Sequence, residues 1–302
     1  MHKHSTTLMR ALELIGLSPL IRRAAGRSEI TIGLIDGPVA KGHPDLESQN
    51  VRELPGANGG SCALPSSAAC QHGTFVAGIL LARRGSAAPA ICPGCTLLVR
   101  PIFSEGNSGN GDMPSATPQE LASAIRETIE AGARILNLSA ALSQPSVEGE
   151  GELQSALDYA VQRAVIVVAA AGNQGMVSSS VITRHPWVIP VAGCDLQGRP
   201  QSQSNLGSSI GRRGLLAPAE GITSLGSEGE PVSFGGTSAA APFVTGAFAL
   251  LWSEFPDAAP AELLLAVRGT RRLSRVGIVP PLLDAWSAHQ VMLSRGYTAD
   301  SR

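Results

Sequence analysis

Aromatic side chains and charges are both scarce in this sequence of 302 residues. Phe, Trp and Tyr make up 4% of it and charged residues 16%, whereas hydrophobic residues make up 43%. This composition excludes disordered and fibrous proteins. Because aromatic rings are few, small aliphatic side chains must fill the interior, and these suit helices packed closely against both faces of a sheet.

An excess of charge of either sign is also absent. The chain has 23 basic and 24 acidic residues, for a formal net charge of −1. Nucleic-acid binding requires a basic surface, so we expect no nucleic-acid partner. We interpret the short basic pairs as solvated surface. These pairs are Arg22-Arg23, Arg83-Arg84, Arg212-Arg213 and Arg271-Arg272.

The sequence lacks a window of about 18 uncharged apolar residues, which argues against a membrane span. In residues 1–28, Arg10 and Glu13 interrupt the leucines. This segment therefore predicts a short amphipathic helix packed on the domain, and it does not resemble a secretory signal. We expect a cytoplasmic protein with no membrane partner.

The five cysteines leave the redox compartment open. Cys62 and Cys70 lie in one loop, Cys92 and Cys95 flank a Pro-Gly pair, and Cys194 stands alone. An odd number leaves at least one thiol unpaired. The spacing of Cys62 and Cys70 is wider than in the usual zinc sites, so we expect no metal and no cofactor. Local disulfides and reduced thiols remain alternatives, and disulfides would indicate an oxidising compartment.

Short β-branched runs alternate with helical patterns along the chain. This alternation predicts an α/β fold with a doubly wound, mainly parallel sheet and helices on both faces. We expect strands at residues 29–35, 96–103, 134–138, 164–169, 188–191, 214–217 and 232–234. We expect helices at residues 73–82, 117–131, 151–163, 238–253, 260–268 and 282–293.

No linker or internal repeat divides the chain. We therefore expect an N-terminal extension at 1–28, one domain at 29–295 and a C-terminal tail at 296–302. Thr117-Pro118-Gln119-Glu120 has the form of a capping box with proline at the first helical position, so it predicts where one helix begins.

Two candidate catalytic residues follow predicted elements. Asp36 comes at the carboxyl end of a buried strand, where open α/β sheets bind ligands. Taken alone, an Asp that caps a turn fits this position equally well. His72 stands at the mouth of the predicted helix at 73–82, and an imidazole is a general base near neutral pH when a carboxylate fixes its tautomer. A lone His is more often a cap or a surface residue, so the pairing with Asp36 is what favours a function.

Ser238 follows a glycine-rich turn, Gly235-Gly236-Thr237, and opens an apolar helix. A helix N-terminus stabilises negative charge that develops beside a nucleophile, and glycines let a substrate backbone approach. An ordinary serine cap is the alternative interpretation.

Together these segments resemble the subtilisin-like serine peptidases. Their motifs appear here in the family's order of Asp, His and Ser. The matching segments are Ile35-Asp36-Gly37 with His43-Pro44-Asp45-Leu46, His72-Gly73-Thr74, Ala170-Ala171-Gly172-Asn173-Gln174-Gly175, and Gly236-Thr237-Ser238-Ala239-Ala240-Ala241-Pro242. The resemblance covers residues 29–290.

The resemblance implies a single-domain subtilisin-like fold and a serine endopeptidase. Asp36, His72 and Ser238 would form the catalytic triad, and Asn173 would donate to the oxyanion. The alternatives are an inactive fold that binds peptides, and a peptide ligase or macrocyclase. The resemblance also implies a peptide or protein substrate, bound in extended form between Ser139 and the stretch near Ser108. Its substrate-binding residues would be Ser108, Gly109, Ser139, Ala140, Ala141, Ala170, Gly172 and Thr237.

The chain also departs from the usual family pattern. Asp36-Gly37-Pro38-Val39 resembles the cyanobactin-type maturation proteases, which cut precursor peptides. Macrocyclising members carry a helical insertion, and the interval from Asp36 to His72 leaves little room for one, so hydrolysis is favoured over cyclisation. With about 28 residues before the first strand, we expect an enzyme that folds without a cleaved prodomain. Residues 83–91 offer no acidic or amide side chain, so we expect no tight calcium site there.

Overall fold

A parallel sheet forms the centre of the protein. The computed structural model describes residues 2–55, 61–105, 116–139, 149–269 and 277–299. Within these residues seven strands pair in the order β2-β3-β1-β4-β5-β6-β7, and every neighbouring pair is parallel. They are β1 (Thr31–Asp36), β2 (Val51–Glu53), β3 (Thr96–Pro101), β4 (Ile135–Leu138), β5 (Ile166–Ala170), β6 (Ile189–Cys194) and β7 (Leu215–Pro218).

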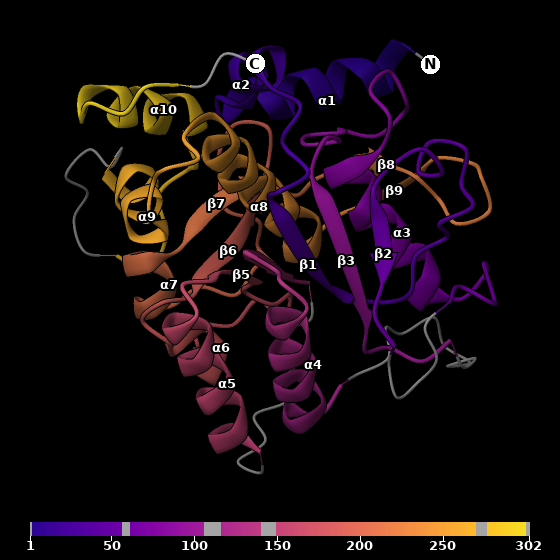
Figure 1. Cartoon of the computed structure of the whole chain (residues 1–302), viewed down its shortest axis with the longest axis horizontal. Helices are drawn as coiled ribbons and strands as arrows, with labels where there is room; N and C mark the ends of the chain where they lie inside the picture. The colour runs from indigo at the N-terminus through magenta and orange to yellow at the C-terminus, as the bar shows by residue number, and fades with distance from the viewer. Residues whose placement is uncertain (1, 56–60, 106–115, 140–148, 270–276, 300–302) are drawn as a thin grey trace.

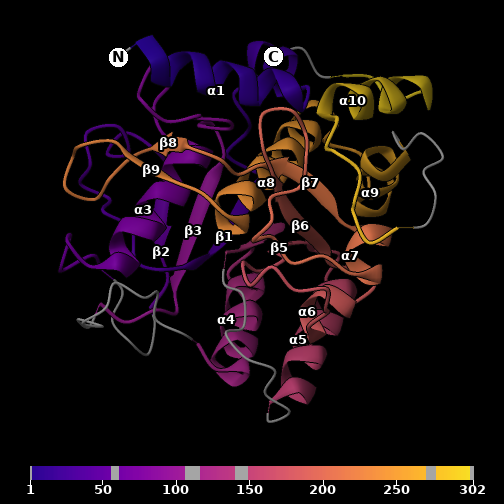
Figure 2. The ribbon, with the colours of Figure 1, turned by 180° about the vertical axis from the view of Figure 1, so that it is seen from behind.

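Helices cover both faces of this sheet. Successive strand residues point to opposite faces: in β1, Ile32 and Leu34 belong to the hydrophobic cluster that includes α3 and α8, whereas Ile35 belongs to the cluster that includes α4 and α5. Figures 1 and 2 show α4 and α5 side by side, away from α8. The predicted single-domain, doubly wound fold is confirmed. The helices named here are α3 (Ala68–Leu81), α4 (Pro118–Glu130), α5 (Glu150–Gln162) and α8 (Thr237–Glu254).

The strand register brings the ends of three strands into line. Ile35 of β1 lies opposite Leu138 of β4, and Leu138 lies opposite Ala169 of β5. The residues that follow these three positions, Asp36, Ser139 and Ala170, therefore come to the same carboxyl edge of the sheet. This is the edge at which open α/β sheets bind their ligands.

The start of α3 differs from the prediction. The helix begins at Ala68 and not at residue 73, because the Ser67 hydroxyl caps it by accepting a hydrogen bond from the Cys70 N–H. His72 therefore lies in the second turn of the helix and not at its mouth. The predicted capping box of α4 is confirmed, since Thr117 and Glu120 bond each other's backbone N–H at 2.8 and 3.2 Å.

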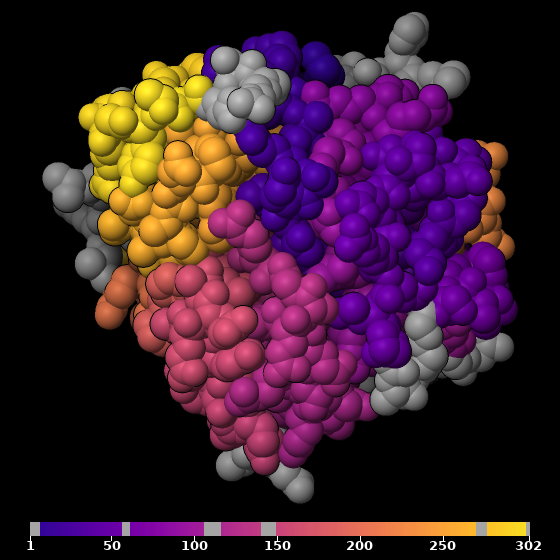
Figure 3. Space-filling model, in the orientation of Figure 1, coloured from indigo at the N-terminus to yellow at the C-terminus, as the bar shows by residue number. Residues whose placement is uncertain are grey.

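Two helices form at the N-terminus, where the sequence predicts one. They are α1 (His2–Leu14) and α2 (Leu17–Arg23), and Gly16 joins them in a left-handed conformation with φ of +66°. Leu17 and Leu20 are fully buried in the cluster of α8. The Arg23 guanidinium donates to the Glu254 carboxylate at 3.0 Å, at the far end of α8 from Ser238. On the face seen in Figure 3, the indigo N-terminal part of the chain lies between the purple part and the orange and yellow parts.

Several short elements were not predicted. Strand β2 has three residues that are at most half-buried, so it lacks the apolar run that marks the inner strands. The last helix begins at Ala285 and not at 282, because Asp284 caps it. No helix in the described part of the chain combines the length and apolarity that crossing a bilayer requires. Three further short elements were not predicted, namely α6 (Val181–Arg184), α7 (Ser208–Arg213) and β8 (Ile222–Ser224), whereas β9 (Val232–Phe234), α9 (Pro260–Gly269) and α10 (Ala285–Ser294) correspond to predicted elements.

The structure pairs two of the five cysteines. Cys62 and Cys70 form a disulfide at the first turn of α3, whereas Cys92, Cys95 and Cys194 are free and buried. The sequence leaves local disulfides and reduced thiols open as alternatives. Cys62 and Cys70 form a local disulfide, whereas Cys92 and Cys95 are thiols.

We predict that alkylation distinguishes these two groups. Iodoacetamide added to the unfolded, unreduced protein should give three adducts, and prior reduction should give five, because only the Cys62–Cys70 pair is protected. Intact-mass analysis counts the adducts, and peptide mapping assigns them. Five adducts without reduction would contradict the pairing.

Candidate active site

Asp36 lies at the end of β1, in the middle of the sheet, and is completely buried. Its Oδ1 accepts the Gly37 N–H at 2.6 Å and faces the imidazole of His72. Only glycine fits at position 37, because a Cβ there would come within 2.0 Å of the Ala69 carbonyl oxygen. The missing side chain lets α3 approach the end of β1.

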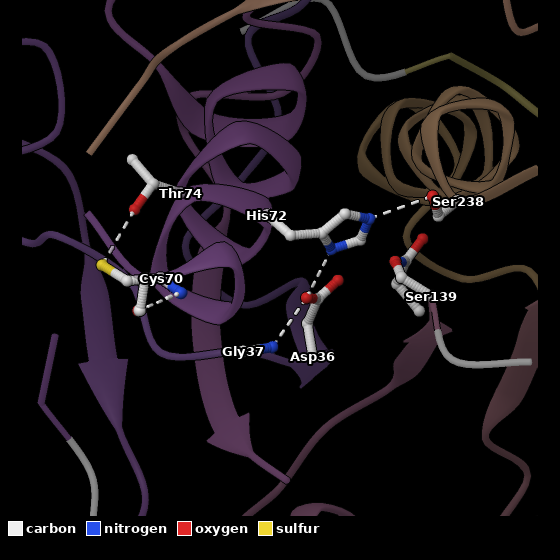
Figure 4. A network of polar contacts seen from close by, with 9 residues as sticks. Asp36, Gly37, Cys70, His72, Thr74, Ser139 and Ser238 are labelled. Carbon is white, nitrogen blue, oxygen red and sulfur yellow. Dashed lines mark hydrogen bonds and ion pairs between the residues drawn. The ribbon is translucent and has the colours of Figure 1, made fainter. Parts of the chain in front are cut away.

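His72 links Asp36 to Ser238 (Figure 4). Its Nδ1 lies 2.7 Å from Asp36 Oδ1, and its Nε2 lies 2.9 Å from Ser238 Oγ. A neutral imidazole with its proton on Nδ1 donates to Asp36 and accepts from the Ser238 hydroxyl. This is the state that a general base requires before it removes the serine proton.

The environment of His72 sets its protonation. Burial by itself lowers the pKa of His72, but the negative charge of Asp36 and the hydrogen bond to it together outweigh burial, so the pKa is raised above its ordinary value. The ring of Phe234 lies over one side of the imidazole, with 6.5 Å between ring centres. A proton taken up by this imidazole would therefore be stabilised by a buried carboxylate.

Ser238 lies in the first turn of α8 and is half-buried. The first N–H groups of a helix have no partner within the helix, so the Ser238 N–H is available to a ligand. Asn173 reaches the same point from the turn after β5. Its Oδ1 accepts the Thr237 N–H at 2.8 Å, and its Nδ2 donates to no group in the described ranges. The bond to Thr237 thus holds the Asn173 amide at the start of α8, next to the residue that precedes Ser238.

Thr237 fixes this arrangement from both sides. Its hydroxyl accepts the Gly172 N–H at 3.1 Å, while its own N–H is bonded to Asn173. Gly236 has a φ of +85°, and a Cβ there would lie 2.9 Å from the Asn173 amide. Glycine at 236 therefore permits both the backbone conformation and the close approach of the amide.

Ser139 comes from the end of β4 and is buried beside the triad, as Figure 4 shows. Asn137 Nδ2 donates to its Oγ at 2.7 Å, and the Thr245 hydroxyl of α8 donates to Asn137 Oδ1 at 2.8 Å. This chain of bonds fixes Ser139 relative to the helix that carries Ser238. Its assignment to substrate binding stays a prediction.

The remaining predicted substrate-binding residues fall into two groups. Gly172 and Thr237 contact each other beside Asn173, and Ala170 is buried at the end of β5. Four others lie outside the described residues, namely Ser108, Gly109, Ala140 and Ala141.

Sequence reasoning missed two residues at this site. Phe234 packs between His72 and Phe75, whose ring centre is 4.9 Å away. Asn205 contacts the turn that carries Asn173. Phe234 is an apolar residue just before the glycine-rich turn, which is a detectable signal. Asn205 lies in a polar segment without periodicity, where nothing in the sequence distinguishes it.

We find no free set of metal ligands among the described residues. Among the described residues, the one group of His, Cys, Asp and Glu side chains close enough to share an ion is Cys62, Cys70 and Glu105. The two sulfurs are joined to each other, and the Glu105 carboxylate accepts the N–H groups of Ala63 and Leu64 at 3.0 and 2.9 Å. Their ligand atoms are therefore occupied.

Comparison with solved structures identifies similar folds. The protease domain of PatA, in a mutant form, superposes with a TM-score of 0.80 at 30% identity, covering 92% of this chain and 98% of that one. The prenylagaramide maturation protease PagA superposes with a TM-score of 0.80 at 26% identity, covering 91% and 97%. The PatG macrocyclase domain, at 22% identity and a TM-score of 0.79, shows the same fold over 92% and 96% of the two chains.

Comparison of sequences gives the family. Fervidolysin from Fervidobacterium pennivorans is 30% identical over 296 residues, which are 86% of this chain and 40% of that protein. Mycosin-1 from Mycobacterium tuberculosis is 31% identical over 254 residues, 67% of this chain and 55% of that protein, so the chain spans about half the length of these relatives. A model of the subtilase family matches residues 27–274. The chain therefore belongs to the subtilase family of serine proteases.

Proposed function

We propose that this chain is an active serine endopeptidase that forms an acyl-enzyme on Ser238. The observation that carries the proposal is the continuous line from Asp36 through His72 to Ser238, with contacts of 2.7 and 2.9 Å. A fold that only bound peptides would need no such line, nor an adjacent pair of oxyanion donors. Both features support catalysis over simple binding.

The mechanism follows from these contacts. His72 removes the Ser238 proton as Oγ attacks the scissile carbonyl, and Asp36 stabilises the imidazolium. Asn173 Nδ2 and the Ser238 N–H donate to the oxyanion of the tetrahedral intermediate. His72 then gives its proton to the leaving amine, and a water molecule activated by the same imidazole releases the acyl group.

The substrate that we propose is an extended segment of a precursor peptide. PatA and PagA are maturation proteases by their titles, and they are 30% and 26% identical to this chain. The segment Asp36-Gly37-Pro38-Val39 supports the same branch. An extended peptide would add a strand beside Ser139, at the carboxyl edge of the sheet.

We propose hydrolysis in preference to peptide ligation or cyclisation. Between β1 and α3, the described residues form strand β2 and no helix. An inserted helix that covered the site and excluded water would favour attack on the acyl-enzyme by an amine. Because the described residues of this interval hold no such helix, we propose water as the nucleophile.

The cytoplasmic location stays a prediction. Disulfides persist in oxidising compartments and are rare in the cytoplasm. The Cys62–Cys70 bond therefore supports the oxidising compartment that the cysteine count leaves open.

The first test of the proposal is covalent labelling. A fluorophosphonate probe should label the wild type on Ser238 and should not label Ser238→Ala. The matched control is Ser208→Ala, which removes an exposed serine that also opens a helix and should label normally. A wild type that stays unlabelled while a known serine protease reacts would refute catalysis.

The same proteins, incubated with a peptide library, test the reaction. Mass spectrometry should find products that contain one added water and that are missing with Ser238→Ala. Products joined or cyclised without added water would refute hydrolysis in favour of ligation.

The pH profile tests the role of Asp36. His72 must be neutral to accept the serine proton, and its pKa is raised, so kcat/KM should fall as the pH decreases through a midpoint above the ordinary value of about 6.5. In Asp36→Asn the charge is lost while burial remains, so this midpoint should move to lower pH and kcat should drop by about 10⁴. Initial rates across about pH 5–9 measure both. An acid limb that stays in place in Asp36→Asn would contradict the assignment.

A further inference from the structure

The turn that carries Asn173 is held by a second asparagine. This oxyanion turn, residues 171–176, lies beside the segment 203–206, which joins β6 to α7. Asn205 in this segment is 9% exposed, whereas Asn173 at the turn is exposed. The exposed donor therefore depends on buried contacts of its neighbours for a fixed position.

Asn205 makes five hydrogen bonds to the oxyanion turn. Its backbone N–H donates to the Gly172 carbonyl at 2.8 Å. Its Nδ2 donates to the Ala171 carbonyl at 3.2 Å and to Gln174 Oε1 at 2.6 Å. Its Oδ1 accepts the N–H groups of Gln174 and Met176, both at 3.1 Å. The side-chain amide thus uses both of its N–H donors and both acceptor positions of its oxygen.

These contacts determine the orientation of the amide. Two backbone N–H groups face its oxygen, and two oxygen acceptors face its nitrogen, so the reversed amide would lose all four side-chain bonds. An aspartate, which cannot donate when ionised, would place its second oxygen against the Ala171 carbonyl and Gln174 Oε1. The site therefore selects asparagine specifically.

The bonds of Asn205 lie on both sides of Asn173. They fix the carbonyls of Ala171 and Gly172 before it and the N–H groups of Gln174 and Met176 after it. Gly172 is pressed against the amide, since a Cβ at this position would lie 2.4 Å from Asn205 Nδ2. Thr237 holds the turn from the opposite side, through Gly172 and Asn173 itself.

We propose that Asn205 is a positioning residue for the oxyanion hole, acting on catalysis through Asn173; this rests on the proposed peptidase function. Oxyanion donors are effective only when they are already in place at the transition state, and a displacement of about 1 Å costs about 100-fold in rate. Asn205 fixes the main chain that carries Asn173, so its loss lets the Nδ2 donor move away from the oxyanion.

A double-mutant cycle tests this inference. Asn205→Ala should lower kcat by about 10- to 100-fold and change KM by less than about threefold, because the donor acts mainly in the transition state. Asn173→Ala should lower kcat by about 10²- to 10³-fold. If Asn205 acts through Asn173, the double variant should match Asn173→Ala within about threefold. Losses that multiply would overturn the inference.

Ser204→Ala is the matched control. Ser204 is the preceding residue and is also buried, but its hydroxyl accepts the Gly193 N–H of β6 at 3.0 Å and not a group of the turn. We expect a lower melting temperature with kcat within about twofold of the wild type. A loss of kcat in Ser204→Ala as large as that in Asn205→Ala would mean a general loss of stability, and would overturn the inference.

A second variant keeps the test decisive if Asn205→Ala does not fold. Gln174 is exposed, so Gln174→Met should fold while it removes the acceptor that lies 2.6 Å from Asn205 Nδ2. We expect kcat to fall about three- to tenfold in the wild type and to stay unchanged when Asn173 is already alanine. An equal loss on both backgrounds would overturn the inference.

Failure of the inference differs from failure of the proposed function. A wild type that neither cleaves peptides nor reacts with the fluorophosphonate probe refutes the function, and the inference with it. A wild type that cleaves and reacts, but whose Asn205 and Asn173 losses multiply, refutes the inference alone.

Discussion

Direct contact between the main chains at the end of β1 and the start of α3 sets the distance between Asp36 and His72. A Cβ on Gly37 would lie 2.0 Å from the Ala69 carbonyl oxygen, and a Cβ on Gly73 would lie 2.4 Å from the carbonyl oxygens of Gly37 and Pro38. Side chains at these two glycine positions would push the strand and the helix apart, and the 2.7 Å contact between imidazole and carboxylate would be lost. The imidazole and the carboxylate are therefore positioned by the absence of side chains at these two glycines.

The same kind of contact recurs on the other side of the catalytic centre. Gly236 lets the start of α8 approach the Asn173 amide, and Gly172 lets the turn after β5 approach Asn205. Each of these glycines also has a positive φ, which other residues adopt at a cost. The site is thus assembled from backbone segments in contact, and the scarcity of aromatic residues in the chain agrees with interfaces of this kind.

The parts of the site that could be predicted are those that local sequence encodes. Asp36 is followed by Gly37, Ser238 comes two residues after Gly236, and both border elements whose apolar runs are strong, so both could be assigned. The start of α3 could not, because Gly73 looks like the end of a loop while the real cap is Ser67. The pairing of Cys62 with Cys70 depends on where the chain folds back, and the role of Asn205 depends on a turn about 30 residues away. These are tertiary relations, which neither periodicity nor capping signals contain.

The packing of α2 makes residues near the N-terminus part of the hydrophobic core. Leu17 and Leu20 are fully buried, and Arg23 is bonded to Glu254, whose side chain is only 3% exposed. A chain shortened past α2 would expose the apolar surface of α8 and leave the Glu254 carboxylate with His289 as its remaining partner among the described residues. Burying a leucine side chain stabilises a fold by about 1.5–3 kcal/mol, so these two leucines supply a large share of the stability of an ordinary domain. The Arg23 side chain is 40% exposed, so solvent screens its ion pair and the pair adds little. A proteolytic cut that released this segment would therefore remove part of the core and destabilise the whole domain.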